Sequence, residues 1–240
     1  MFSIGNKGYA LFSNSSSGTS PLQEFDPTTG VWTNKGNYPG NNVTPMYTKK
    51  AFVIGNNAYV MHHNSVTNSY ELWKYNQLSN TWTQRASLPK PSGMLPVDFT
   101  FALGAKGHIM FKVTQLQSIQ IPPSVSLFYS YDTVTNVWTP KTAYPGDRRY
   151  DVTGFVIGSY AYVGTGKLAF AQTNQNTFYR YNTGTNQWTS VASYSGGPTS
   201  KGIGFNIGSY GYLLDFYNLT LPPGGNYFYK YKTPSLVFPN

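Results

Sequence analysis

The sequence contains no cysteine and few charged residues, and both absences limit what the protein can be. Without cysteine there is neither a disulfide framework nor a thiolate metal site. Charged residues make up 10% of the 240, and only 8 are Asp or Glu. No two of these eight are spaced like the facing carboxylates of a glycoside hydrolase. A Walker motif, a phosphate-binding glycine loop and a Ser-His-acid order are also missing.

Helical patterns and long apolar runs are missing as well. No stretch shows amphipathic helical periodicity, no apolar run is long enough to span a membrane, and no secretory signal pattern is present. The chain has instead 21 Tyr, 15 Phe, 24 Gly and 16 Pro. This composition is typical of short strands joined by many turns, and the length suits one large all-β domain.

The basic charge is spread along the chain. The formal net charge is +9, from 17 Lys and Arg against 8 Asp and Glu. The only adjacent pairs are Lys49-Lys50 and Arg148-Arg149. A nucleic-acid groove gathers its basic residues into a patch or stripe, so we expect no nucleic-acid partner.

One unit recurs five times along the chain. A glycine ends its first strand each time, and the steps between successive glycines are 50, 49, 54 and 50 residues. A Phe precedes each glycine by three residues, and a Tyr or His follows it by four. The glycines are Gly5, Gly55, Gly104, Gly158 and Gly208. Seven residues after a later Tyr or Phe stand the packing residues Trp32, Trp82, Trp138, Trp188 and, in the last copy, Phe238.

The repeat predicts five small sheets within a single domain over residues 1–240. Each unit supplies four strands, a to d, and four-stranded antiparallel sheets repeated about an axis form a β-propeller. The large Trp of each unit is expected to pack between adjacent sheets. The predicted blades cover about 1–50, 51–99, 100–153, 154–203 and 204–240.

The unit resembles the kelch repeat, most closely its bacterial secreted form. The resemblance is carried by the segment from Tyr131 to Thr139, YDTVTNVWT, and by Tyr144 to Arg149, YPGDRR. It spans the whole chain and departs from the family where a glycine doublet usually closes strand b, since Val163-Gly164-Thr165-Gly166 stands there. The resemblance implies an all-β propeller of five kelch-like four-stranded blades, in an extracellular or cell-surface bacterial protein.

Loop lengths indicate which face binds a ligand. The a–b and c–d turns keep their lengths in every unit, whereas the b–c and d–a loops vary. Because successive strands alternate in direction, the two variable loops emerge on the same face. Variable loops on a rigid scaffold usually carry specificity, so we expect a protein or glycan ligand there.

Several residues of that face are candidates for ligand binding. The segment from Asp147 to Asp151 has the densest charge, and its arginines suit a carboxylate or phosphate, although a self-compensated loop is the favoured interpretation because exposed ion pairs are common and weak. Three histidines, with His108 at a core position, are too few for a metal site, so we expect neither metal nor cofactor. The candidates are Asp147, Arg148, Arg149, Tyr150, His62, His63, Tyr194 and Tyr217.

The sequence leaves three hypotheses open. The first is non-enzymatic binding through the variable face, without catalytic residues. The second is an enzyme of sugar chemistry such as a sialic-acid mutarotase, which resembles this fold and would use Arg148 or Arg149 with a carboxylate such as Asp147. The third is a structural unit that assembles through its chain ends.

Overall fold

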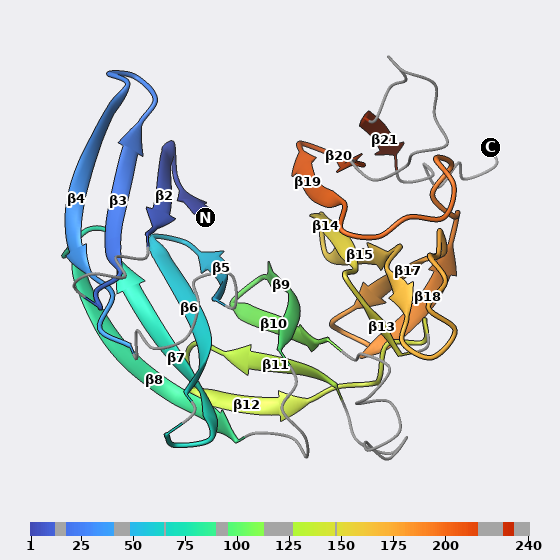
Figure 1. Cartoon of the computed structure of the whole chain (residues 1–240), viewed down its shortest axis with the longest axis horizontal. Helices are drawn as coiled ribbons and strands as arrows, with labels where there is room; N and C mark the ends of the chain where they lie inside the picture. The colour runs from blue at the N-terminus through green and yellow to red at the C-terminus, as the bar shows by residue number, and fades with distance from the viewer. Residues whose placement is uncertain are drawn as a thin grey trace. The chain divides into compact units, whose positions relative to one another are not determined.

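All regular structure among the described residues is β-structure (Figure 1). The computed structural model describes residues 1–12, 18–40, 49–64, 66–89, 96–112, 127–146, 148–215 and 228–232. Within these ranges no helix has the length and hydropathy of a membrane span. The chain divides into two compact units, which are described separately here. Unit 1 is Met1–Phe111 with Ile121–Lys141, and unit 2 is Lys112–Gln120 with Thr142–Asn240.

Unit 1 contains three four-stranded sheets, and each strand pairs with the next in the chain. The first sheet comprises β1 (Phe2–Ile4), β2 (Lys7–Leu11), β3 (Pro21–Asp26) and β4 (Val31–Asn37). The second comprises β5 (Lys50–Ile54), β6 (Asn57–Asn64), β7 (Ser69–Asn76) and β8 (Thr81–Pro89). The third comprises β9 (Val97–Leu103), β10 (Lys106–Phe111), β11 (Phe128–Asp132) and β12 (Val137–Pro140).

Unit 2 contains one more four-stranded sheet, a sheet with three described strands and a short ribbon. The fourth sheet comprises β14 (Thr153–Ile157), β15 (Tyr160–Gly164), β17 (Phe178–Asn182) and β18 (Gln187–Val191). The fifth comprises β19 (Ile203–Ile207), β20 (Tyr210–Leu214) and β21 (Phe228–Lys232). The ribbon pairs β13 (Arg149–Tyr150) with β16 (Lys167–Leu168). The outer strand expected at Phe238 lies outside the described residues.

The five sheets are the blades of a β-propeller, so the predicted fold class is confirmed. In every blade the Phe of strand a faces the aromatic residue of strand b across the ladder, and the two rings are stacked. These pairs are Phe2–Tyr9, Phe52–Tyr59, Phe101–His108, Phe155–Tyr162 and Phe205–Tyr212. The single domain over residues 1–240 stays a prediction.

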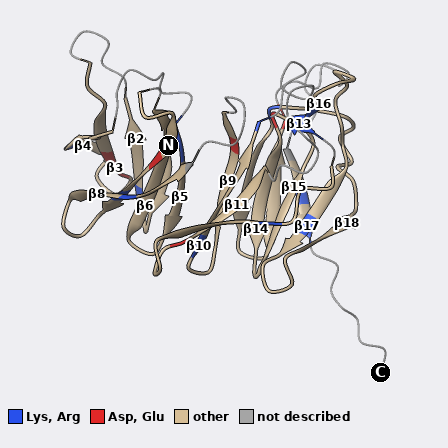
Figure 2. Cartoon of the chain, turned by 90° about the horizontal axis from the view of Figure 1, so that it is seen from below, with Lys and Arg blue, Asp and Glu red and all other residues tan. Residues whose placement is uncertain are grey.

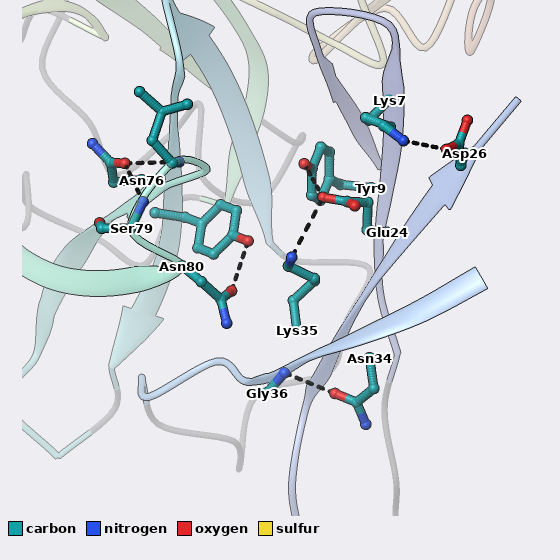
Figure 3. Close-up of polar contacts among 12 residues, drawn as sticks. Lys7, Tyr9, Glu24, Asp26, Asn34, Lys35, Gly36, Asn76, Ser79 and Asn80 are labelled. Atoms are coloured by element: carbon teal, nitrogen blue, oxygen red, sulfur yellow. Dashed lines mark hydrogen bonds and ion pairs between the residues drawn. The ribbon is translucent and has the colours of Figure 1, made fainter. Parts of the chain in front are cut away.

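A hydroxyl–amide latch closes the c–d turn of three blades. A strand-c tyrosine hydroxyl donates to the side-chain oxygen of an Asn five residues later, and that Asn has a positive φ. The pairs are Tyr75–Asn80 (2.9 Å; Figure 3), Tyr131–Asn136 (2.6 Å) and Tyr181–Asn186 (2.9 Å). Blade 1 has Phe25 and Gly30 at these positions, with Gly30 at φ 71°. Asn tolerates the left-handed region and Gly enters it freely, so both combinations form the turn.

A second set of hydrogen bonds, the clamp, joins neighbouring blades. The indole N–H of Trp138 donates to the carbonyl of Ala86 in strand d of the preceding blade, at 2.7 Å. The N–H of Ala86 donates to the Asn136 side chain at 2.9 Å. In unit 2, Trp188 and Asn186 hold both backbone groups of Thr142 in the same way, at 3.1 and 3.2 Å. The backbone is thus fixed from both sides at Ala86, within β8, and at Thr142, two residues after the end of β12.

The clamp does not form at the first interface of unit 1. Gly36 holds the corresponding position, and its N–H donates to Asn34 at 2.7 Å instead (Figure 3). The indole nitrogen of Trp82 is buried with no hydrogen-bond partner among the described residues. Trp82 therefore contributes to this interface by packing alone.

The residue six positions after each Trp packs into the next blade, and we call it the peg. Tyr38 lies edge-on to Trp73 and Trp82 of blade 2, and Tyr144 lies edge-on to Tyr179 and Trp188 of blade 4. The other two pegs are Leu88, in the cluster of Phe111 and Tyr131, and Tyr194, against Tyr229. A glycine covers each Tyr peg because a Cβ there would lie only 2.3–2.5 Å from its ring; these are Gly40, Gly146 and Gly196.

The packing residues differ in exposure according to these contacts. Trp82, Trp138 and Trp188 are half-buried, whereas Trp32 is 52% exposed and contacts Phe12 and Phe25 of its own blade. The inter-blade role expected of the tryptophans is therefore observed at three of the four described positions, Trp82, Trp138 and Trp188.

We expect Trp138→Phe to lower the free energy of unfolding by about 1–2 kcal/mol more than Trp82→Phe, because the carbonyl of half-buried Ala86 loses its donor. Trp82→Phe is the matched control, since it loses similar packing while its indole nitrogen bonds to no described residue. Urea unfolding followed by far-UV circular dichroism compares the two. Equal losses in both variants would show that the indole hydrogen bond contributes nothing.

Candidate functional site

Three loops of the variable face meet in unit 2. The b–c loop of blade 4, residues 165–177, is described in full and lies between two d–a segments. On one side Tyr150 pairs with Lys167 in the β13–β16 ribbon, and on the other Gln175 forms a bridge with Thr199. The b–c and d–a loops of this unit thus lie at the same end of the blades, as the alternation of strands predicts.

These loops enclose a pocket of about 300 Å³, which we call the loop pocket. Its lining residues are Tyr150, Asp151, Lys167, Asn174, Ser200 and Lys201. Asp151 and Lys201 each stand four residues before the strand-a Phe of their blade, and both have positive φ, 56° and 63°. The N–H of Lys201 donates to the carbonyl of Asp151 at 3.0 Å. Left-handed non-glycine residues carry strain that often collects at functional sites.

Charge and hydrogen bonding fix one side of the loop pocket. The ammonium of Lys112 donates to the Asp151 carboxylate at 2.7 Å and also lies 4.9 Å from the centre of the Tyr150 ring. The hydroxyl of Tyr150 donates to the Gln172 side chain at 2.7 Å. Tyr150 is therefore held in place, with one ring face covered by a cation.

Positive charge exceeds negative charge around this pocket. The site has three lysines, Lys112, Lys167 and Lys201, and one aspartate, Asp151. The net charge of these four residues is 3 − 1 = +2. Figure 2 shows most of the ribbon in tan, with charged segments at scattered positions, some of them beside β13 and β16. A locally positive, concave surface attracts anionic groups.

Arg149 lies beneath the loops. Its side chain is buried, and its guanidinium donates to the carbonyl of Thr165 at 3.1 Å and to the hydroxyl of Thr177 at 2.8 Å. It thereby ties both ends of the b–c loop to β13. Arg148 is half-buried, and its carbonyl accepts from the N–H of Ala169 at 2.7 Å. A ligand contact for either arginine stays a prediction.

Tyr194 belongs to a different part of unit 2. Its hydroxyl donates to Asp215 at 3.4 Å, and Thr199 donates to the other carboxylate oxygen at 2.9 Å. Asp215 is fully buried, and burial raises the pKa of Tyr194. A cavity of about 60 Å³ adjoins Tyr194 and is lined by apolar side chains such as Phe155 and Leu213. The structure does not bring Tyr194 to the loop pocket.

The candidate histidines lie in unit 1, within a buried polar chain. Nδ1 of His62 is 2.7 Å from the hydroxyl of Tyr38, and its Nε2 is 3.6 Å from the Glu71 carboxylate. Glu71 also accepts hydrogen bonds from Asn64 and Trp73. Burial lowers the pKa of His62 to about 4, so the ring is neutral at pH 7.

The other two histidines pack against aromatic rings. His63 lies at the end of β6 with its ring against Tyr70, and His108 is buried in the blade 3 stack. Within the described ranges, no three His, Asp or Glu side chains gather as metal ligands would. Asp147, Tyr217 and Phe238 lie outside those ranges.

Sequence reasoning missed most of the loop pocket. It selected Tyr150, but not Lys112, Lys167, Asn174, Ser200 or Lys201, and it selected His62 without Tyr38 or Glu71. One signal for the pocket was available, because Asp151 and Lys201 hold the same position before strand a in two successive repeats.

Comparisons with known proteins support the fold. No family model matches the chain, and a search of the curated proteins finds no relative. Among solved structures the chain is similar to the structure of YjhT, with a TM-score of 0.62 and 16% sequence identity. The match covers 87% of this chain and 69% of that one. At this identity the likeness shows the fold alone, and the class of protein it defines is the β-propeller.

We expect acid to destabilise the protein between about pH 6.5 and pH 4. Burial lowers the pKa of both His62 and His108 to about 4, so the unfolded chain binds more protons than the folded one in this range. As the pH falls from 6.5 to 4, proton uptake by the unfolded chain lowers the free energy of unfolding by about 3 kcal/mol for each histidine. Above pH 6.5 both states are neutral at these positions and this loss is absent.

Urea unfolding at pH 7.0, 5.5 and 4.5 measures this loss. His108→Tyr, which installs the residue found in the other four stacks, should show roughly half the loss of the wild type. An identical pH dependence in wild type and variant would contradict the assignment.

Proposed function

We propose that the protein is a non-enzymatic binding module that holds a protein or glycan through the loops of its variable face. The loop pocket carries this proposal, because it is a concave site formed by three variable loops above a rigid pair of blades. Its lining offers amide, hydroxyl, ammonium and carboxylate groups, the kind of polar groups that orient a ligand.

The chemistry of the lining favours binding over catalysis. Asp151 is the one carboxylate among the six lining residues, and Lys112 already pairs with it at 2.7 Å. Acid–base catalysis needs a proton donor or acceptor within reach of the substrate, with a pKa suited to the task. Lysines, a paired aspartate, an amide and hydroxyls are better suited to hydrogen bonding and charge complementarity.

The finer assignment belongs to the same proposal. A kelch-like repeat is supported by the segment YPGDRR, in which Gly146 packs on the ring of Tyr144, and by Asp132, which accepts two backbone N–H groups of its own turn. With that resemblance we propose an extracellular or cell-surface location. Neither a nucleic-acid partner nor a cofactor forms part of the proposal, and assembly through the chain ends remains its structural alternative.

The alternative of a sugar-active enzyme has one observation in its favour. The hydroxyl of Tyr38, the imidazole of His62 and the carboxylate of Glu71 lie in succession, as groups that move protons do, although the 3.6 Å between Nε2 and the carboxylate is longer than a hydrogen bond. All three side chains are buried, however, and Tyr38 also serves as a peg against Trp82. The simplest role of this buried group of three residues is to join blades 1 and 2.

Filling the loop pocket should abolish binding. We expect Ser200→Trp to weaken at least tenfold any ligand found on a glycan array or a panel of purified surface proteins, because the indole occupies the pocket. Ser209→Trp, in the a–b turn of blade 5 at the opposite end of the strands, is the matched control and should bind normally. Empty screens, or equal losses in both variants, would remove the support for a binding module.

The enzyme alternative is tested directly with sialic acid. We expect the wild-type protein not to accelerate interconversion of the sialic-acid anomers, followed by proton NMR after dissolving one crystalline anomer. Acceleration that disappears in both Arg148→Ala and Asp147→Ala, with unchanged unfolding midpoints, would overturn the binding proposal in favour of catalysis.

A further inference from the structure

The loop pocket has a charge that selects among ligands. Of the charged groups around it, Lys112 and Asp151 form an ion pair at 2.7 Å and largely cancel one another. Lys167 and Lys201, from the b–c loop and the following d–a segment, are the two lysines of the lining. A carboxylate or another anion placed between these two loops would be attracted by both.

The aromatic groups at this site indicate what carries the anion. Lys112 covers one face of Tyr150 and Gln172 accepts from its hydroxyl, so this ring is already engaged within the protein. Phe170, two residues before Gln172, is 72% exposed. Exposed aromatic side chains on fixed loops serve as anchors in protein interfaces.

The turn that presents Phe170 is well fixed. The N–H of Gln172 donates to the carbonyl of Leu168 at 3.0 Å, and its side-chain amide donates to the carbonyl of Ala169 at 2.5 Å. Ala169 donates in turn to the carbonyl of Arg148. Because the turn is already ordered, burying Phe170 against a partner requires little further loss of backbone freedom.

We infer that the loop pocket binds an acidic protein segment, in which an Asp or Glu side chain lies between Lys167 and Lys201 and a neighbouring apolar side chain packs on Phe170. This inference rests on the proposed binding function and specifies its ligand. The pocket volume of about 300 Å³ is sufficient for one or two side chains. The net charge of +9 favours approach of an acidic partner and makes association sensitive to salt.

A selection from random heptapeptides displayed on phage tests the inference with the intact protein. We expect the selected peptides to be enriched in Asp or Glu next to an apolar residue. Fluorescence polarisation with the best peptide should show at least tenfold weaker binding for Lys167→Glu and for Lys201→Glu. Lys232→Glu, on β21 near the a–b turn of blade 5, is the control and should bind within twofold of wild type.

A charge swap tests whether the contact between the lysines and the acidic residue is specific. A peptide with its acidic residue changed to Lys should bind wild type at least tenfold more weakly and regain affinity with Lys201→Glu or Lys167→Glu. Phe170→Ser should weaken the original peptide without changing its salt dependence. Unfolding midpoints within 2 °C of wild type would show that the variants fold, as expected for substitutions in loops.

The outcomes separate the two proposals. Selected peptides without acidic residues, or binding that is insensitive to both lysine reversals, overturn the acidic-segment inference. A failed peptide selection alongside a glycan whose binding Ser200→Trp abolishes also overturns it, but leaves the binding module intact. Failure of both the peptide and the glycan screens removes both.

Discussion

The packing of a peg residue onto aromatic side chains of a neighbouring blade, seen at the four described peg positions, is the interaction on which the rest depends. Tyr38 and Tyr144 each meet two aromatic rings of the following blade edge-on, an arrangement worth about 0.5–1.5 kcal/mol per pair beyond the area buried. Because a blade of four short strands has little core of its own, the burial shared with its neighbour stabilises the packing of the sheets. Three pegs, Tyr38, Tyr144 and Tyr194, lie in the d–a loops one to four residues after strand d, so they anchor the start of that part of the variable face.

The fold could be predicted because its requirements are local. A glycine with positive φ ends strand a, an aromatic pair stacks across strands a and b, and each leaves a mark in the sequence at fixed spacing. The clamp could not be predicted, because the groups held at Ala86 and Thr142 are backbone atoms that any residue supplies. The pegs could be predicted in part. Tyr-Pro-Gly was recognisable as a motif, but the aromatic rings on which its tyrosine packs belong to the next repeat.

The site was harder to predict because nothing in its residues is unusual. Lys167 and Lys201 are two of many scattered lysines, and Asn174 and Ser200 are common loop residues. They come together through backbone pairing, in the β13–β16 ribbon and in the bridge between Gln175 and Thr199. Sequence reasoning reached Tyr150 because it stands in a charged cluster. In the same cluster Arg149, selected for its charge, lies below the loops and holds them together.

The hydroxyl–amide latch has a consequence for how such chains diversify. The tyrosine and the asparagine stand five residues apart in one hairpin, and blade 1 lacks both at once, with Phe25 and Gly30 in their places. The two partners depend on one another where both are present, because losing the amide would leave a buried phenol to find another acceptor. In the sequence, blade 5 keeps the tyrosine, Tyr231, but has Leu236 five residues later, so the two positions do not always change together. Transplanting a whole hairpin would carry both partners at once, whereas changing one position at a time would separate them.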